Sequence, residues 1–125
     1  MQGSKVYDLL ARTEKFSLSV RDFCLKLKRD IVNREYITQL VRSAGSVAAN
    51  YIEANENLGE ADLRFRIKVC RKEAKESKLW LNHTLTYGDE VLENERLSLL
   101  QEALELELIL GAILKKLLQK SVAGN

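Results

Sequence analysis

The sequence has 125 residues, of which 46% are hydrophobic and 30% charged, a composition typical of one globular domain rather than a disordered chain. It has no proline and only six glycines, which favours long helices over a turn-rich β fold. The net charge of +2 does not by itself indicate a nucleic-acid binder. Neither a signal sequence nor a run of about 18 apolar residues is visible, so we expect a soluble, cytoplasmic protein in which Cys24 and Cys70 are reduced core thiols.

The first half of the chain predicts two helices, over residues 5–28 and 34–58. Apolar residues of the first recur at alternating steps of four and three positions, which is the pattern of one helix face. This stripe comprises Leu9, Thr13, Phe16, Val20, Phe23 and Leu27. Ser4 and Asn33 are the expected N-caps of the two helices. Gly59 is the expected left-handed stop of the second helix.

The middle of the second predicted helix, residues 43–54, is rich in Ala, Gly and Ser. A helix face made of such small residues lets a neighbouring backbone come unusually close. The third helix, predicted over residues 60–87, carries matching small residues. We therefore expect these two helices to pack closely through small side chains that face one another rather than water. They are Ala44, Ala48, Ala74 and Ser77.

A fourth helix is predicted over residues 95–120, with Asn94 as its N-cap. Its expected inward face is Leu97, Leu100, Leu104, Leu108, Gly111, Leu114 and Leu118. Further leucines and isoleucines widen this apolar surface beyond the needs of one bundle core. Four amphipathic helices with short connections predict an all-α, antiparallel, up-down-up-down four-helix bundle in a single domain over 1–125. The wide apolar surface predicts a closed homo-oligomer, the alternative being a loosely filled core edge.

Two motifs resemble a known family. They are Arg42–Ala54, RSAGSVAANYIEA, and Phe65–Leu81, FRIKVCRKEAKESKLWL. Both are similar to the paired motifs of the four-helix-bundle proteins encoded within intervening sequences of bacterial large-subunit ribosomal RNA genes, and the resemblance covers residues 7–87. That family often has a proline between its first two helices, whereas Asp30–Asn33 has none.

The resemblance implies a left-handed bundle that assembles into a ring, with a pentamer favoured. It also implies kinship to the accessory variability proteins of diversity-generating retroelements, which are basic barrels that bind nucleic acid and a reverse transcriptase. For many plain members of the family no biochemical role is established. The resemblance therefore supports the fold and the assembly more strongly than it supports any activity.

The third predicted helix concentrates cations. Residues 60–86 hold seven basic and four acidic side chains, whereas residues 87–125 hold four and seven. The candidate nucleic-acid-binding residues are Arg64, Lys68, Arg71, Lys72, Lys75 and Lys78. Long cations on one helix face can neutralise phosphates, so together with the resemblance they predict binding to RNA or another nucleic acid. The alternative is a solvated face with i,i+4 ion pairs; Trp80 and Tyr87 are the aromatics available for base stacking.

Glutamates occur in pairs at i,i+3 spacing on the second and third predicted helices. The pairs are Glu53 with Glu56, and Glu73 with Glu76. Four carboxylates on adjacent helices can hold Mg²⁺, an arrangement that loosely resembles all-α nucleotide pyrophosphohydrolases. The alternative, which we favour, is that basic residues pair with them inside the bundle or across subunits. We expect a structural polar network of Asn50, Glu53, Arg71 and Glu73.

The sequence shows no recognisable catalytic pattern. It has no Gly-rich phosphate loop, no Cys-x-x-Cys and no nucleophile–base–acid set. Its single histidine, His83, excludes a di-iron centre built on two Glu-x-x-His motifs and is expected at the surface. We therefore predict a non-catalytic protein without metal or cofactor. A protein-binding scaffold and a Mg²⁺-dependent nucleotide pyrophosphohydrolase are the alternative functions.

Overall fold

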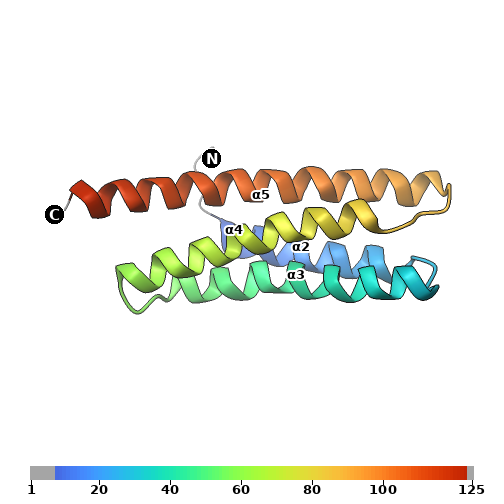
Figure 1. Ribbon diagram of the computed structural model, residues 1–125, viewed down its shortest axis with the longest axis horizontal. Coiled ribbons are helices and arrows are strands. Elements are labelled where there is room, and N and C mark those ends of the chain that lie inside the picture. Colours follow the sequence, from blue (N-terminus) through green and yellow to red (C-terminus); the bar gives the residue numbers. More distant parts are fainter. Residues whose placement is uncertain (1–7, 124–125) are drawn as a thin grey trace.

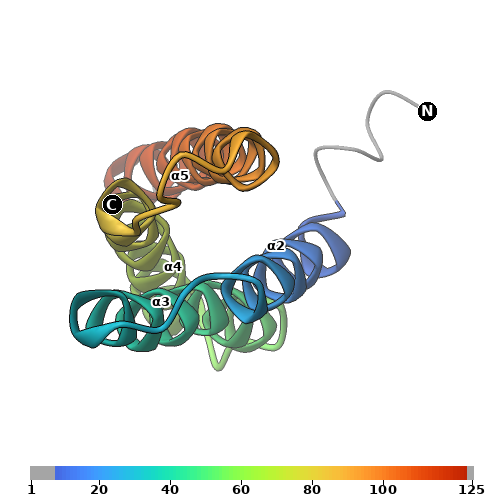
Figure 2. The same ribbon diagram turned by 90° about the vertical axis from the view of Figure 1, so that its right-hand side faces the viewer.

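The computed structural model describes the backbone of residues 8–123 and the side chains of residues 8–120. Four helices follow in this range: α2 (Leu9–Leu25), α3 (Ile31–Asn55), α4 (Glu60–His83) and α5 (Glu90–Ala123). Consecutive helices run in opposite directions (Figure 1) and succeed one another around the bundle when it is viewed end-on (Figure 2). The predicted all-α, up-down-up-down four-helix bundle is therefore confirmed.

The second helix begins earlier than the sequence predicted because a different residue caps it. Asp30 is extended at the N-cap, and its carboxylate accepts a hydrogen bond from the backbone N–H of Asn33 at 2.9 Å. The expected cap Asn33 thus lies inside α3, which ends at Asn55 rather than at residue 58. The other expected cap, Ser4, lies outside the described residues.

The remaining boundaries also shift by a few residues. Gly59 does not stop α3 but precedes α4, with a φ of 133° that favours glycine. α4 ends at His83 rather than at residue 87. α5 begins at Glu90 rather than at 95, because the Asp89 carboxylate accepts a hydrogen bond from Leu92 N–H at 3.0 Å. These turn carboxylates satisfy free N–H groups before the predicted caps are reached.

α3 packs more extensively against α4 than any other helix pair packs. Ala44, Ala74 and Ser77 are fully buried, while Ala48 is partly buried. The Ser77 hydroxyl donates a hydrogen bond to the Ser43 hydroxyl across the interface at 3.0 Å. The prediction of a close α3–α4 contact through small side chains is therefore confirmed, since neither helix presents a large side chain at these positions.

The inward face of α5 differs from the predicted one. The buried residues are Leu99, Ala103, Leu106, Leu110 and Leu114. Of the predicted stripe, Leu97, Leu108 and Leu118 are exposed, and only Leu114 is fully in the core. The prediction failed because leucines occupy both stripes, and helical periodicity alone does not say which one faces inward. α5 therefore carries a second, exposed apolar stripe along its outer side.

One buried side chain joins two connections at the same end of the bundle. Asn33 is fully buried, and its amide nitrogen donates to Lys28 C=O at 2.8 Å and to Leu85 C=O at 3.0 Å. Its amide oxygen accepts from Leu85 N–H at 2.9 Å. Asn33 thereby links the α2–α3 connection to the segment after α4, and its own buried amide group has hydrogen-bond partners.

Replacing Ala74 by Leu should destabilise the protein, because the added carbons force α4 away from α3. Overpacking of this kind costs about 1–3 kcal/mol, measured as the free energy of unfolding in urea. Ala61→Leu, at an exposed position in the first turn of the same helix, is the matched control and should be near neutral. Unchanged stability of Ala74→Leu would contradict the close approach of the two helices.

Asn33→Ala should also destabilise the bundle, because both backbone groups of Leu85 lose their partner. Each lost hydrogen bond costs about 0.5–1.5 kcal/mol, measurable by thermal or urea unfolding. The control is Asn82→Ala, because Asn82 is exposed on α4. Equal stability of the two variants would show that Asn33 does not hold the connections together.

Candidate nucleic-acid interface

Two acidic residues of α4 are paired with a cation of α3. Arg42 on α3 forms ion pairs with both Glu76 and Glu73, the latter at 3.5 Å between Arg42 Nη2 and Glu73 Oε1. Arg66 of α4 lies 3.4 Å from Asp62 and donates a hydrogen bond to Asn50 Oδ1 of α3 at 3.2 Å. One flank of α4 is therefore a set of paired charges shared with α3.

The other flank of α4, turned toward α5, carries cations. Only one of the six predicted binding residues has an acidic partner there: Lys78 Nζ lies 2.5 Å from Glu107 Oε1. For the remaining five, no carboxylate among residues 8–120 lies within 4.0 Å. We call these five the cationic face of α4: Arg64, Lys68, Arg71, Lys72 and Lys75. All are exposed except Arg64, which is partly buried.

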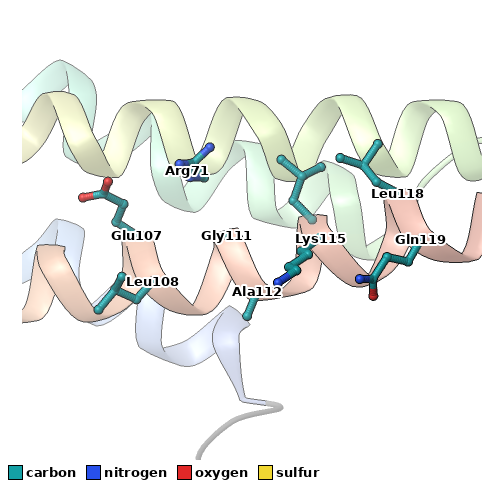
Figure 3. A pocket seen from close by; sticks show the side chains of 9 residues that line it. Arg71, Glu107, Leu108, Gly111, Ala112, Lys115, Leu118 and Gln119 are labelled. Carbon is teal, nitrogen blue, oxygen red and sulfur yellow. The ribbon is translucent and has the colours of Figure 1, made fainter.

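Arg71 occupies a distinct place on this face. Figure 3 shows its side chain above Gly111 of α5. A Cβ atom added at Gly111 would lie 3.4 Å from Arg71 Nε, so the glycine leaves room for the guanidinium group close to the α5 backbone. Arg71 borders a groove of about 790 Å³. Its other lining residues are Glu107, Leu108, Gly111, Ala112, Leu114, Lys115, Leu118 and Gln119.

Both aromatic residues that the sequence offered for base stacking make contacts within the bundle, although Tyr87 is 55% exposed. Trp80 is partly buried and stacks on Tyr36, with ring centroids 6.1 Å apart, and its edge meets His83. The Tyr87 hydroxyl bonds to Asp30, and Lys28 Nζ lies 5.1 Å from the Tyr87 ring centre. These contacts tie both rings to the bundle.

Phe65 is the aromatic residue that the sequence analysis missed. It is 57% exposed on α4 and lies one heptad before Lys72, so both occupy the same outer stripe of the helix. Arg66 lies 5.5 Å from its ring centre, measured to the guanidinium carbon. The available signal was the seven-residue spacing from Phe65 to Lys72, which places an apolar ring among cations.

The four residues of the predicted polar network do not come together. Asn50 bonds to Arg66, and Glu73 pairs with Arg42. Glu53 is exposed, and Arg71 points toward α5. Polar groups do join α3 to α4, but Arg71, the one basic residue of the predicted network, is not among them, because Arg66 and Arg71 lie on opposite flanks of α4.

The structure also shows where the four glutamates considered as magnesium ligands lie. Glu53 and Glu56 are exposed on α3, whereas Glu73 and Glu76 are engaged by Arg42. Within residues 8–120, no three His, Cys, Asp or Glu side chains lie close enough to hold a metal ion. The two glutamate pairs therefore do not come together as the four carboxylates of a magnesium site would.

The two cysteines are free and buried, as predicted. Burial raises the pKa of the Cys24 thiol and of the Cys70 thiol to about 12, so both stay protonated near neutral pH. His83 is exposed at the end of α4, also as predicted. Across residues 8–123, none of the helices combines the length and apolarity that crossing a membrane requires.

These features define an all-α four-helix bundle in which α4 has one flank of paired charges and one cationic flank. No family model and no curated protein matches the sequence. The fold is similar to the crystal structure of a protein of unknown function from the S23 ribosomal protein family of Bacteroides thetaiotaomicron. The two chains share 23% identity over 89% of this chain and 98% of the other, with a TM-score of 0.72. At this identity the likeness establishes a shared fold.

Proposed function

We propose that this protein is a non-catalytic member of the ribosomal intervening-sequence group that binds RNA or another nucleic acid through the cationic face of α4. The observation that carries the proposal is the absence of acidic partners for Arg64, Lys68, Arg71, Lys72 and Lys75 among residues 8–120. The fold shared with a protein assigned to the S23 ribosomal protein family supports it.

Unpaired cations on a rigid helix suit phosphate recognition. From residue 64 to residue 75 the helix rises about 16 Å, at 1.5 Å per residue, so the charges form an extended row. Each neutralised phosphate releases counterions, which makes the affinity fall with added salt. Because Arg42 pairs with both Glu73 and Glu76 on the other flank and cancels one of their two charges, these carboxylates offset the row less than the composition of α4 suggests.

This face favours single strands and weak sequence preference. Phosphate contacts position a nucleic acid without reading its bases. Phe65 adds an exposed ring beside the cations, and any base can stack on such a ring. The ligand class is therefore single-stranded RNA or DNA rather than a defined duplex site.

Assembly is the second part of the proposal. The exposed outer stripe of α5, with Leu108 62% exposed, supports a homo-oligomer, and the family resemblance favours a pentamer. The same stripe supports the alternative of a scaffold that binds another protein. A magnesium-dependent hydrolase is disfavoured by the separation of the two glutamate pairs described above.

Reversing three charges on the face should abolish most of the binding. In the triple variant Lys68→Glu, Lys72→Glu, Lys75→Glu, we expect weak binding to an oligouridylate and a salt slope smaller by about 0.7 for each lost contact on single strands. Fluorescence anisotropy over a salt titration measures both. The control with the same net charge is Lys15→Glu, Arg29→Glu, Arg34→Glu, at exposed positions on α2, on α3 and in the connection between them.

Lys78→Gln provides an internal control because Lys78 is already paired with Glu107. It should weaken binding less than Lys72→Gln does. Equal losses in the two triple variants would show that net charge, not this face, governs binding. Negligible binding by the unmodified protein at low salt would remove the nucleic-acid proposal altogether.

Phe65→Ala should weaken binding to single strands by about 1–3 kcal/mol, the usual worth of one stacked base, and should leave the salt slope unchanged. Leu79→Ala is the matched control, because Leu79 is exposed on the same stripe but offers no ring. Equal effects of the two substitutions would contradict a stacking role for Phe65.

A further inference from the structure

The groove beside Arg71 is apolar with a cationic rim. Leu108, Ala112 and Leu118 of α5 are exposed along it. Glu107 contributes little negative charge because it is paired with Lys78. Arg71 and Lys115, in contrast, have no carboxylate within 4.0 Å among residues 8–120. An occupant that satisfies this groove must therefore be apolar and must bring carboxylates.

The C-terminal end of α3 has the complementary character. Ile52 is 53% exposed, and Leu58, in the turn to α4, is 93% exposed. Glu53 and Glu56 lie beside them, both exposed, with no cationic group within 4.0 Å among residues 8–120. This end therefore presents two protruding apolar side chains and two uncompensated negative charges.

We infer that the α3 end of one copy docks in the α4–α5 groove of the next copy. The acidic surface comprises Ile52, Glu53, Glu56 and Leu58, and the receiving surface comprises Arg71, Leu108, Ala112, Lys115 and Leu118. This inference names the interface of the homo-oligomer in the proposed function and rests on that part of it.

The pairing accounts for groups that one chain leaves without partners. Two carboxylates meet two cations, so the charges that are removed from water remain balanced. Ile52 and Leu58 cover leucines that would otherwise form an exposed apolar patch. Because Gly111 has no side chain, Arg71 lies close to the α5 backbone, at the border of the groove that the neighbouring chain would enter.

When each of the two surfaces meets a different neighbouring copy, the contact is head-to-tail rather than two-fold symmetric. Such contacts close into rings when the rotation between copies allows it. Of the cationic face, Arg71 would be covered by the neighbouring copy, whereas Lys68, Lys72 and Lys75 take no part in the pairing and stay available for nucleic acid. Assembly and nucleic-acid binding can accordingly be tested separately.

Charge reversal tests the interface without RNA. The full chain and two double variants, Arg71→Glu with Lys115→Glu and Glu53→Lys with Glu56→Lys, are compared by light scattering after size-exclusion chromatography. Each double variant should fall to the mass of one chain. The chain that carries all four reversals should regain the oligomer, because its surfaces are complementary again.

Mixing the two double variants should restore contacts between unlike chains, and because a five-membered ring cannot alternate, the mixture should give assemblies with an even number of chains. The controls Lys116→Glu and Glu35→Lys reverse exposed charges on the same two helices outside the surfaces and should leave the oligomer intact. Leu58→Ser should weaken assembly, whereas Val91→Ser, at another highly exposed apolar position, should not.

The outcomes separate this inference from the assembly proposal itself. A wild-type chain that is monomeric at high concentration overturns both. An oligomer that survives both double reversals overturns the interface alone. Failure of the fourfold variant to reassemble, although circular dichroism shows its helices intact, also overturns the interface.

Discussion

The close contact between α3 and α4 determines how the rest of the molecule is arranged. With Ala44 and Ala74 fully buried and Ser77 bonded to Ser43, the two helices approach through positions where any larger side chain would separate them. This contact fixes the rotation of α4 about its own axis. Because the rotation is fixed, Glu73 and Glu76 reach Arg42 while the cations on the opposite flank turn toward α5 and solvent.

Local patterns in the sequence predicted the fold and the basic candidates. Small residues at matching spacings identified the close helix pair, and the three- and four-residue spacing of cations identified the binding candidates. Asp30 and Asp89 began their helices earlier than predicted, since several nearby residues can cap a helix and sequence alone does not choose among them. For α5, leucines on both sides of the helix left its inward face undetermined.

The spacing of charged residues did not predict which of them form ion pairs between helices. Arg66 and Arg71 look equivalent in the sequence, yet one reaches Asn50 on α3 and the other lies over Gly111 on α5. Lys78 likewise looks like its neighbours on α4 but is paired with Glu107. Which cations stay free depends on side chains distant in the sequence, and this distinction separates a solvated face from a binding face.

The buried thiols can be used to measure local opening of the bundle. Cys70 faces the α3–α4 contact, where its S–H group points at Val47 C=O at 3.5 Å, and Cys24 is buried on α2. A reagent that reacts with thiolates reaches each sulfur only when its surroundings separate. The rate of modification therefore reports either the rate or the equilibrium constant of that local opening. The two labelling rates would therefore rank detachment of α2 against separation of α3 from α4, in a chain whose natural residues already serve as the probes.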